Sequence, residues 1–545
     1  MCGIWALLKS NIKLSQDIID SLTTVKNRGP DSTTIHVDSN YISCFHRLAI
    51  NDISVCGNQP FYHSTDDYNY VLMANGEIYN HNQLKSEYNI KLNSSSDCAV
   101  LLPLFIKLNE DNTRFNQLLR GEYSILIIKQ HKKTNLITFF ASTDPLSVRP
   151  LFYYINNDKC EIGFSSILGG LSNLSNDVYR LDQGTIFTGN IGIDNIIEHQ
   201  IIKYHRTDLP FEINSDSNLY RQIVDVLTES VILRLESDRP LGCLLSGGLD
   251  SSLIAAIASK ELAKKGQILR TFSIGMKDGT DLKYAKIVAD HINSDHTEYY
   301  FTAEEGLAAI EDVMIATETY DITTIRASVG QYLIAKNIAE KTDVKVILNG
   351  DGADECQMGY LYFYLHPNEK EALNERNKLL QQIHLFDGLR VDRNLSYHGL
   401  EARVPFLDKE FVDLYYRIPA SLLVPTTDHM EKYLIRKAFE IIEPQLLPSV
   451  ILWRKKEAFS DGVSSNENSW FQILKTHFNN LISDQEFKIK DTITNIKPLC
   501  KESFYYRKKF NELFGENHNV IPRYWMPNWT TTSDPSARTL DIYNC

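Results

Sequence analysis

Apolar and polar positions alternate differently in the two halves of this 545-residue chain. In the first half, short apolar runs bounded by polar turns indicate strands; the runs read IWALL, YVLMAN, SILIIK, LITFFA and FYYI. Helical spacing appears there at 16–26 and 97–108. The first half is therefore expected to be built from sheets with a few helices.

From residue 219 onwards, helical spacing alternates with short apolar runs. This pattern predicts helices at 219–237, 252–265, 281–293, 304–317 and 328–341, and strands at 241–245, 269–275 and 344–348. Such alternation favours a doubly wound parallel sheet. The last third is mostly helical and ends in a segment rich in Trp, Tyr, Pro and Thr, which is expected to be mobile and uninformative about function.

A polar, acidic segment at 205–218 separates the two patterns and contains a proline, which suits a linker. A chain of this length exceeds what a single hydrophobic core supports. We therefore predict two domains, at 1–205 and 219–545, one of class α+β and one of class α/β.

The composition excludes several classes of function. With 43% hydrophobic and 23% charged residues the chain reads as an ordinary globular protein. A net charge of −13, without a dense basic block, argues against a nucleic acid or a membrane surface as partner. No apolar run reaches membrane-spanning length, and the start MCGIWALLK lacks the basic region of a signal peptide. Nine scattered cysteines without a C-x-x-C pair predict neither a zinc site nor a disulfide framework, and favour the cytoplasm.

The most informative stretch follows the predicted strand at 241–245 and reads Ser246-Gly247-Gly248-Leu249-Asp250-Ser251-Ser252. A strand, a Gly-rich turn and a helix together aim backbone N–H groups and a positive dipole end at an anion. Asp250 would repel a phosphate unless a metal ion lay between them, so we interpret it as a Mg²⁺ ligand. No P-loop lysine follows. The stretch resembles the pyrophosphate loop of the ATP pyrophosphatases, which implies ATP as a substrate and release of pyrophosphate.

Cys2 directly follows the initiator methionine. A small second residue normally allows that methionine to be removed, which would give Cys2 a free α-amine. An unperturbed α-amine has a pKa of about 7.7–8.0 and could accept the thiol proton at neutral pH. A nucleophile and its base would then lie on one residue.

Five stretches, the first of which contains Cys2, occur in this order: Cys2-Gly3-Ile4, Arg28-Gly29-Pro30-Asp31, His46-Arg47-Leu48-Ala49-Ile50, Asn75-Gly76-Glu77-Ile78-Tyr79-Asn80 and Ser96-Asp97. Together they resemble the class II glutamine amidotransferase domain of the N-terminal nucleophile (Ntn hydrolase) type. The resemblance implies an αββα sandwich in which Cys2 attacks the amide of L-glutamine.

The same resemblance assigns roles around that nucleophile. Asn75 and the backbone N–H of Gly76 would hold the tetrahedral oxyanion. Arg47 would bind the glutamine α-carboxylate, while Glu77 and Asp97 would bind its α-amine. Two apolar residues would wall the pocket: Leu48 and Ile50.

Four further stretches lie in the second half: 318–328 (ETYDITTIRAS), 349–355 (NGDGADE), 401–408 (EARVPFLD) and 453–462 (WRKKEAFSDG). With the N-terminal set they resemble the glutamine-hydrolysing asparagine synthetases over nearly the whole chain. That family adenylates the β-carboxylate of L-aspartate with ATP and then displaces AMP with ammonia that reaches it through an internal channel. A homodimer is implied by the resemblance as well.

The resemblance also distributes roles in the second half. Pyrophosphate would be held by Ser246, Gly247, Gly248, Asp250, Ser251 and Ser252, and the adenosine part by Leu244, Ile274, Asn349 and Gly350. Asp250 and Asp354 would ligate Mg²⁺. Arg326 and Lys456 would stabilise charge at the phosphorus. Thr323 and Thr324 would position the aspartyl group. Asp351 would accept a proton when ammonia attacks.

This sequence departs from the family pattern at four positions. Asp351 stands where a Glu is usual, and a base displaced by about 1 Å can lose on the order of a hundredfold in rate. Thr143 and Ser147 replace an Arg and a Gly, and Ser166 replaces a Glu. Two alternatives therefore stay open: a related amidotransferase or cyclase that adenylates another carboxylate, and a catalytically degenerate scaffold.

Overall fold

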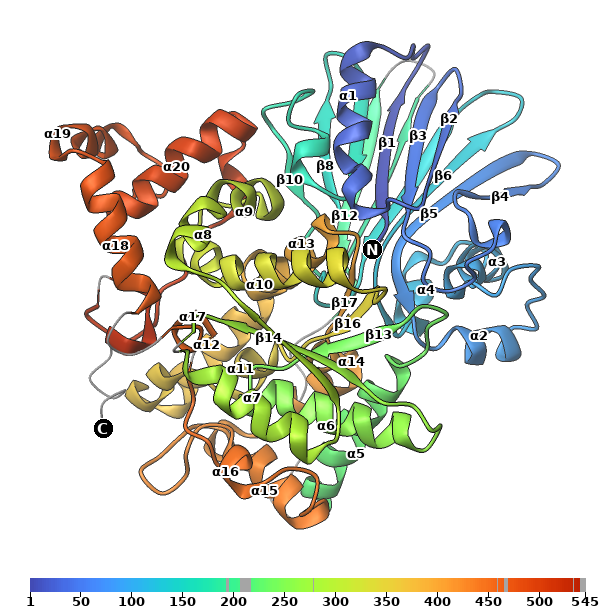
Figure 1. Cartoon of the computed structure of the whole chain (residues 1–545). Coiled ribbons are helices and arrows are strands. Elements are labelled where there is room, and N and C mark those ends of the chain that lie inside the picture. Colours follow the sequence, from blue (N-terminus) through green and yellow to red (C-terminus); the bar gives the residue numbers. More distant parts are fainter. Residues whose placement is uncertain are drawn as a thin grey trace.

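The structure, a computed structural model, describes residues 1–192, 196–205, 217–277, 279–457, 459–464, 469–532 and 534–539 (Figure 1). The predicted linker falls largely outside these residues. The described residues form three sheets, two antiparallel ones near the N-terminus and one parallel sheet further along the chain. The expectation of mixed α+β and α/β classes is confirmed.

The N-terminal region is a sandwich of two six-stranded sheets. The first runs β10 (Tyr179–Arg180), β8 (Phe152–Asn156), β9 (Glu161–Ser165), β1 (Gly3–Lys9), β3 (Tyr41–Arg47) and β2 (Ser32–Val37). The second runs β12 (Ile197–Lys203), β11 (Thr185–Ile191), β7 (Ile137–Thr143), β6 (Gly121–His131), β5 (Tyr68–Ile78) and β4 (Phe61–Ser64).

Alternation along β1 explains how the layers pack. Ile4, Ala6 and Leu8 point into the core between the two sheets, whereas Trp5 and Leu7 point to the outer face. Helix α1 (Gln16–Thr24) covers that outer face with its apolar side. Helices α3 (Leu101–Lys107) and α4 (Asn112–Leu118) cover the outer face of the second sheet. The layers therefore follow the predicted order αββα.

The second half contains a parallel sheet. Its strands are β15 (Asp295–Tyr300), β14 (Arg270–Gly275), β13 (Leu241–Leu244), β16 (Val346–Leu348) and β17 (Glu401–Arg403). The two edge strands, β15 and β17, are additional to the three predicted ones. The doubly wound parallel sheet itself is confirmed.

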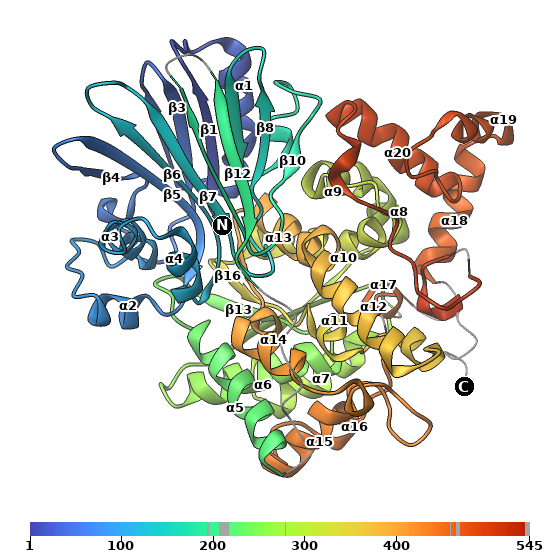
Figure 2. The same cartoon turned by 180° about the vertical axis from the view of Figure 1, so that it is seen from behind.

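Helices cover both faces of this sheet. Helices α10 (Ile322–Lys341) and α13 (Asp387–Tyr397) lie on the side of the N-terminal sandwich, and α6 (Leu249–Ala263) and α7 (Thr280–His291) lie on the opposite side (Figures 1 and 2). Helix α10 starts six residues before the predicted position, because the Asp321 carboxylate caps it by accepting the Thr324 N–H at 2.8 Å. The 318–328 stretch is therefore largely the start of a helix.

Buried ion pairs join the two halves of the chain. Glu122 of β6 accepts hydrogen bonds from Arg149 and Arg234, both at 2.8 Å, and all three side chains are buried. Because breaking one partner of such a pair leaves an uncompensated charge, the interface is firmly specified. Within the described residues, no helix is both long and apolar enough to cross a membrane.

Candidate functional sites

Cys2 directly precedes β1, and its Sγ lies 3.6 Å from the Leu48 carbonyl oxygen. Arg28 Nε donates to the Cys2 carbonyl at 2.9 Å, which fixes the backbone of the residue. Burial raises the pKa of the Cys2 thiol, and the positively charged N-terminus opposes that effect. Burial also lowers the pKa of the Met1 amine to about 6. An amine at this place therefore accepts a proton less readily than an exposed one.

Asn75 is fully buried in β5, and neither polar atom of its amide has a hydrogen-bond partner within the part of the chain that the structure describes. A buried amide without partners costs free energy, so its N–H group is a donor that a ligand can satisfy. The next residue, Gly76, has a φ of 141°, and a Cβ there would lie 1.9 Å from the Glu122 carbonyl oxygen. Glycine is required at 76 for steric reasons, independently of any catalytic role.

The guanidinium of Arg47, at the end of β3, is held by the loop that follows it. Nη1 donates to the Ser54 carbonyl at 2.8 Å and to Asn58 Oδ1 at 2.7 Å, and Nη2 donates to the Asp52 carbonyl. These acceptors are neutral, so they orient the guanidinium without cancelling its charge. A carboxylate ligand would provide the missing counter-charge.

Glu77 and Asp97 place two carboxylates in the same buried region. Burial raises the pKa of Glu77, and the neighbouring Asp97 and Glu401 raise it further. Arg403, whose Nη2 lies 3.3 Å from Glu77 Oε2, opposes the increase. Burial likewise raises the pKa of Asp97. A cation such as an α-ammonium group would stabilise the ionised forms of both carboxylates.

Leu48 and Ile50, the two residues predicted to wall the glutamine pocket, belong to one small apolar cluster with Val346 of β16. β16 leads directly to Asn349 and Asp351 of the second candidate site. The wall of the first site and the strand that supports the second are therefore in contact.

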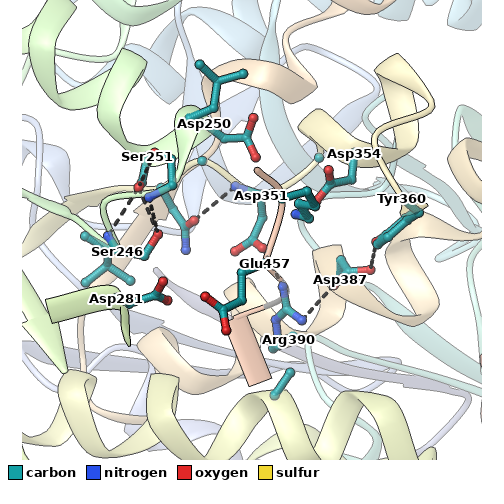
Figure 3. A pocket seen from close by; sticks show the side chains of 18 of the residues that line it. Ser246, Asp250, Ser251, Asp281, Asp351, Asp354, Tyr360, Asp387, Arg390 and Glu457 are labelled. Carbon is teal, nitrogen blue, oxygen red and sulfur yellow. Dashed lines mark hydrogen bonds and ion pairs between the residues drawn. The ribbon is translucent and has the colours of Figure 1, made fainter. Parts of the chain in front are cut away.

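A cavity of about 210 Å³ opens where β13, β14 and β16 end (Figure 3). Ligands of open α/β sheets bind at this place. Twelve of the predicted residues line it: Leu244, Ser246, Gly248, Asp250, Ser251, Ile274, Thr323, Asn349, Gly350, Asp351, Asp354 and Lys456. Figure 3 shows Ser246 and Ser251 on one side of the cavity and Arg390, Asp387 and Tyr360 on the other.

The loop after β13 has the conformation that a phosphate site requires. Gly247 adopts a φ of 75°, and a Cβ there would lie 2.3 Å from the Ala285 backbone nitrogen. Helix α6 then starts at Leu249, three residues before the predicted start, and its N-terminal N–H groups border the cavity. Ser252 is fully buried, and its hydroxyl has no partner among the described residues.

Asp250 and Asp354, the predicted Mg²⁺ ligands, both point into the cavity (Figure 3). Lys432 Nζ lies 2.6 Å from Asp250 Oδ2 and 2.5 Å from Asp354 Oδ1, and Lys456 pairs with the other oxygen of Asp354. Burial alone would raise the pKa of Asp354, but the two lysines hold it below its usual value. Mg²⁺ typically takes one or two carboxylates together with substrate phosphates, so this donor set fits the ion. No group of three or more His, Cys, Asp or Glu suited to a metal occurs among the described residues.

Asp351 is held from two sides. Arg390 Nη2 lies 2.5 Å from its Oδ1, and Gln331 Nε2 donates to its Oδ2 at 3.1 Å. Burial raises the pKa of Asp351, and Arg390 opposes the shift. Asp351 therefore ionises at higher pH than a free carboxylate, which suits a group that takes up a proton.

Arg326 and Thr324 do not line the cavity. The Arg326 guanidinium pairs with Glu502 at 2.7 Å and with Asp534 at 2.8 Å, and Thr324 donates its hydroxyl to Asp321 at 2.7 Å. In this structure both residues hold the fold together, and their contacts with substrate stay predictions.

The expectation that the C-terminal segment carries no functional information is wrong. Trp525 and Pro527 line the cavity, and the Trp525 backbone is held by Asp321 at 2.7 Å and Thr323 at 3.0 Å. Asp534 pairs with Arg326 as described above. Aromatic burial and backbone hydrogen bonds therefore bring this segment to the site.

Several cavity residues were not predicted from the sequence. They are Lys432, Arg390, Asp387, Glu355, Tyr360 and Trp525. Tyr360 donates to Glu355 at 2.6 Å and to Asp387 at 3.1 Å, and so links the acidic residues on that side. Apart from Glu355, which ends the 349–355 stretch, no local pattern in the sequence marks these positions.

The three N-terminal departures have structural partners of their own. Thr143 donates to the Asp182 carbonyl at 2.6 Å, and Ser166 accepts the Ile4 N–H at 2.9 Å. Ser147 adopts a φ of 49° in a loop organised by Asp144, whose carboxylate accepts backbone N–H groups of that loop. The loop is therefore ordered by hydrogen bonds that do not require the usual residues.

A nucleophile-type thiol beside the Asn75 amide, partnerless among the described residues, and the Arg47 guanidinium, together with a Gly-rich phosphate-type loop at a separate cavity, is the arrangement of a two-site amide-forming synthetase that carries its own amidotransferase domain. A family model for glutamine amidotransferase domains matches residues 1–191, and a model for asparagine synthase matches 222–382 and 366–537. The glutamine-hydrolysing asparagine synthetases of Gallus gallus and Homo sapiens are each 38% identical to the chain, over 569 and 582 residues. Each alignment covers 100% of this chain and 99% of the relative.

The chain belongs to the glutamine-hydrolysing asparagine synthetase family. Among solved structures, the NMN synthetase from Francisella tularensis aligns with 58% of this chain and 100% of its own, at 14% identity and a TM-score of 0.25. That overlap is too low to add to the argument.

Proposed function

We propose that this chain makes L-asparagine from L-aspartate, using ATP and the amide nitrogen of L-glutamine. The observation that supports this most is the joint presence of both reaction centres, with the wall of the first packed against β16 of the second. Each centre alone would fit many enzymes. Together, in one chain of this family, they fit a nitrogen donor coupled to an acyl acceptor.

In the first half-reaction, Cys2 is the nucleophile. After removal of Met1, its amine takes the thiol proton and the thiolate attacks the glutamine amide carbon. Asn75 and the Gly76 N–H hold the oxyanion, and ammonia leaves when the carbon–nitrogen bond breaks. Water then releases glutamate from the thioester. Arg47, Glu77 and Asp97 hold the two ends of the amino-acid group.

In the second half-reaction, the β-carboxylate of aspartate attacks the α-phosphorus of ATP, and pyrophosphate leaves. The loop from Ser246 to Ser252 and the N-terminus of α6 hold the departing phosphates. Mg²⁺ held by Asp250 and Asp354 would neutralise charge on those oxygens when bound. Lys456 lies beside Asp354 and supplies a further positive charge near the phosphates.

Ammonia from the first site then attacks the acyl carbon, and AMP leaves as the carbon–oxygen bond breaks. Asp351 takes the proton that the attacking nitrogen loses. In the present structure Asp351 is paired with Arg390. The pair therefore has to loosen before the carboxylate can act as a base.

A product assay tests this function directly. With glutamine, aspartate, ATP and Mg²⁺, asparagine, glutamate, AMP and pyrophosphate should form in equal amounts. Formation of ADP in place of AMP would exclude the adenylation chemistry. Pyrophosphate release that ignores aspartate would favour another carboxylate as the acceptor.

The domain boundaries at 205 and 219, the cytoplasmic location and the homodimer also stay proposals. Limited proteolysis, cell fractionation and light scattering test them in turn. They are independent of the reaction proposed above.

A further inference from the structure

Lys432 is buried at the floor of the nucleotide cavity and was assigned no role from the sequence. It immediately precedes α15 (Tyr433–Ile442) and adopts a left-handed backbone conformation, with φ of 58°. Non-glycine residues are uncommon in that region, because their side chains crowd the backbone there. The surrounding fold therefore maintains a strained backbone at the residue whose side chain reaches between Asp250 and Asp354.

The Lys432 ammonium bridges those two carboxylates. Its Nζ lies 2.6 Å from Asp250 Oδ2 and 2.5 Å from Asp354 Oδ1. Asp250 comes from the first turn of α6 and Asp354 from α11 (Ala353–Gln357), so the ammonium joins two separate helices. The ammonium occupies the place between the oxygens that a divalent cation shared by both carboxylates would take.

The charges in this group already balance. Two carboxylates, Asp250 and Asp354, face two ammonium groups, Lys432 and Lys456. A free divalent cation would add two uncompensated positive charges to a buried site, close to Lys432. A divalent cation that arrives with pyrophosphate or triphosphate adds net negative charge, which Lys432 can neutralise instead.

We propose that Lys432 is a built-in counter-ion that keeps a free divalent cation out of this site, and that the cation binds only together with a polyphosphate. Lys432 then exchanges the carboxylate oxygens of Asp250 and Asp354 for phosphate oxygens. Lys432 is thus a positioning residue for the metal and a direct ligand of the polyphosphate. The inference rests on the ATP site proposed above and adds an obligatory partner exchange to it.

Asp250 Oδ1 defines the competing arrangement. This oxygen is buried and has no hydrogen-bond partner among the described residues. A cation bound there alone would leave Lys432 in place. In that case free metal would bind the wild-type chain about as well as a chain without Lys432.

Direct titration with Mn²⁺, which accepts the same oxygen ligands as Mg²⁺, separates the two arrangements. Free Mn²⁺ is counted by electron paramagnetic resonance, with and without inorganic pyrophosphate. We expect weak Mn²⁺ binding to wild type alone and at least about tenfold tighter binding with pyrophosphate. By linkage, Mn²⁺ should tighten pyrophosphate binding by the same factor. Tight binding of Mn²⁺ alone to wild type would overturn the proposal.

Lys432→Met should bind Mn²⁺ alone at least about tenfold more tightly than wild type. Pyrophosphate should then increase the Mn²⁺ affinity of the variant much less than it increases that of wild type. Lys437→Met is the matched control, since Lys437 lies on α15 but pairs with Glu440 at 2.5 Å, outside the cavity. It should behave as wild type. Equal Mn²⁺ affinities for wild type and Lys432→Met would overturn the proposal.

A second variant guards against loss of folding in Lys432→Met. Lys432→Gln retains hydrogen-bond donors but no charge, and should show the same gain in Mn²⁺ affinity. Adding Asp250→Asn to either variant should remove that gain; a gain that persists would place the metal elsewhere and overturn the proposal.

Aspartate-dependent exchange of pyrophosphate into ATP by wild type is measured separately. Its absence would refute the proposed function, whereas the Mn²⁺ titration addresses Lys432.

Discussion

Arg28 and Asp392 form a buried, two-pronged ion pair between the N-terminal sandwich and helix α13, with nitrogen–oxygen distances of 2.7 and 3.2 Å. The same guanidinium donates from Nε to the carbonyl of Cys2 at 2.9 Å. Earlier in α13, Arg390 pairs with Asp351. One helix therefore contacts both the residue that anchors the proposed nucleophile and the proposed base itself.

Asp392→Asn should lower the stability of the whole protein. In wild type the Asp392 carboxylate pairs with Arg28 and, at 3.4 Å, with Arg149. The substitution leaves both buried guanidinium groups facing a neutral amide. Removing one partner of a buried pair costs about 3–5 kcal/mol. Urea denaturation measures the loss of unfolding free energy. Asp290→Asn, which breaks an exposed pair with Lys286, should leave the midpoint unchanged, and an equal effect of both variants would contradict the argument.

The same pair predicts a pH dependence. Burial would raise the pKa of Asp392, but Arg28 and Arg149 hold it below the usual value. Because the folded-state pKa lies below that of the unfolded chain, the pair stabilises the fold above about pH 4, and this contribution is lost as the pH falls through the folded pKa. The stability gap between wild type and Asp392→Asn should therefore narrow during an acid titration. A constant gap would contradict the assignment.

Cys2→Ala should abolish asparagine synthesis from glutamine and leave synthesis from added ammonia intact. In the proposed reaction the thiol only releases nitrogen, and Cys2 does not line the nucleotide cavity. Cys56→Ser is the control, because that thiol is exposed and should affect neither reaction. If both reactions vanish in a folded Cys2→Ala protein, the assignment of glutamine hydrolysis and amide synthesis to separate sites is wrong.

Asn75→Ala should lower the kcat of glutamine hydrolysis by about 10²–10³ with little change in KM, as expected when one oxyanion donor is lost. Glutamate release measures this, and ammonia-dependent synthesis should be unaffected. Asn116→Ala is a matched control, since Asn116 is equally buried but its amide nitrogen is already bonded to the Asn112 carbonyl at 2.8 Å. A raised KM at constant kcat would assign Asn75 to substrate binding instead.

The sequence predicted those parts of the sites that are contiguous in the chain. The loop from Ser246 to Ser252 and the stretch from Asn75 to Glu77 form local turns and strands whose chemistry is visible in a few neighbouring residues. Lys432, Arg390 and Trp525 reach the same cavity from three distant segments. Their positions depend on tertiary packing, which local periodicity does not encode.

The missed edge strands have a similar cause. β17 consists of Glu401, Ala402 and Arg403, and its two charged residues are buried because they pair with each other at 2.9 Å. A charged tripeptide does not resemble a buried strand, since the compensation comes from ion pairing. β15 reads DHTEYY, which is polar because it lies at the edge of the sheet. In both cases tertiary context overrides the apolar pattern.

Arg390→Met should shift the acid limb of the amination step to higher pH. Burial raises the pKa of Asp351 and the Arg390 guanidinium opposes this, so removal of the guanidinium raises the pKa further. A base must be deprotonated to act, and amination should therefore fail at a higher pH in the variant than in wild type. The ratio of asparagine to pyrophosphate formed with added ammonia measures this step, and ammonium ionisation affects both proteins equally. Asp351→Asn should show a low ratio at every pH. A loss in Arg390→Met that is the same at every pH would mean that Arg390 positions Asp351 without changing its ionisation.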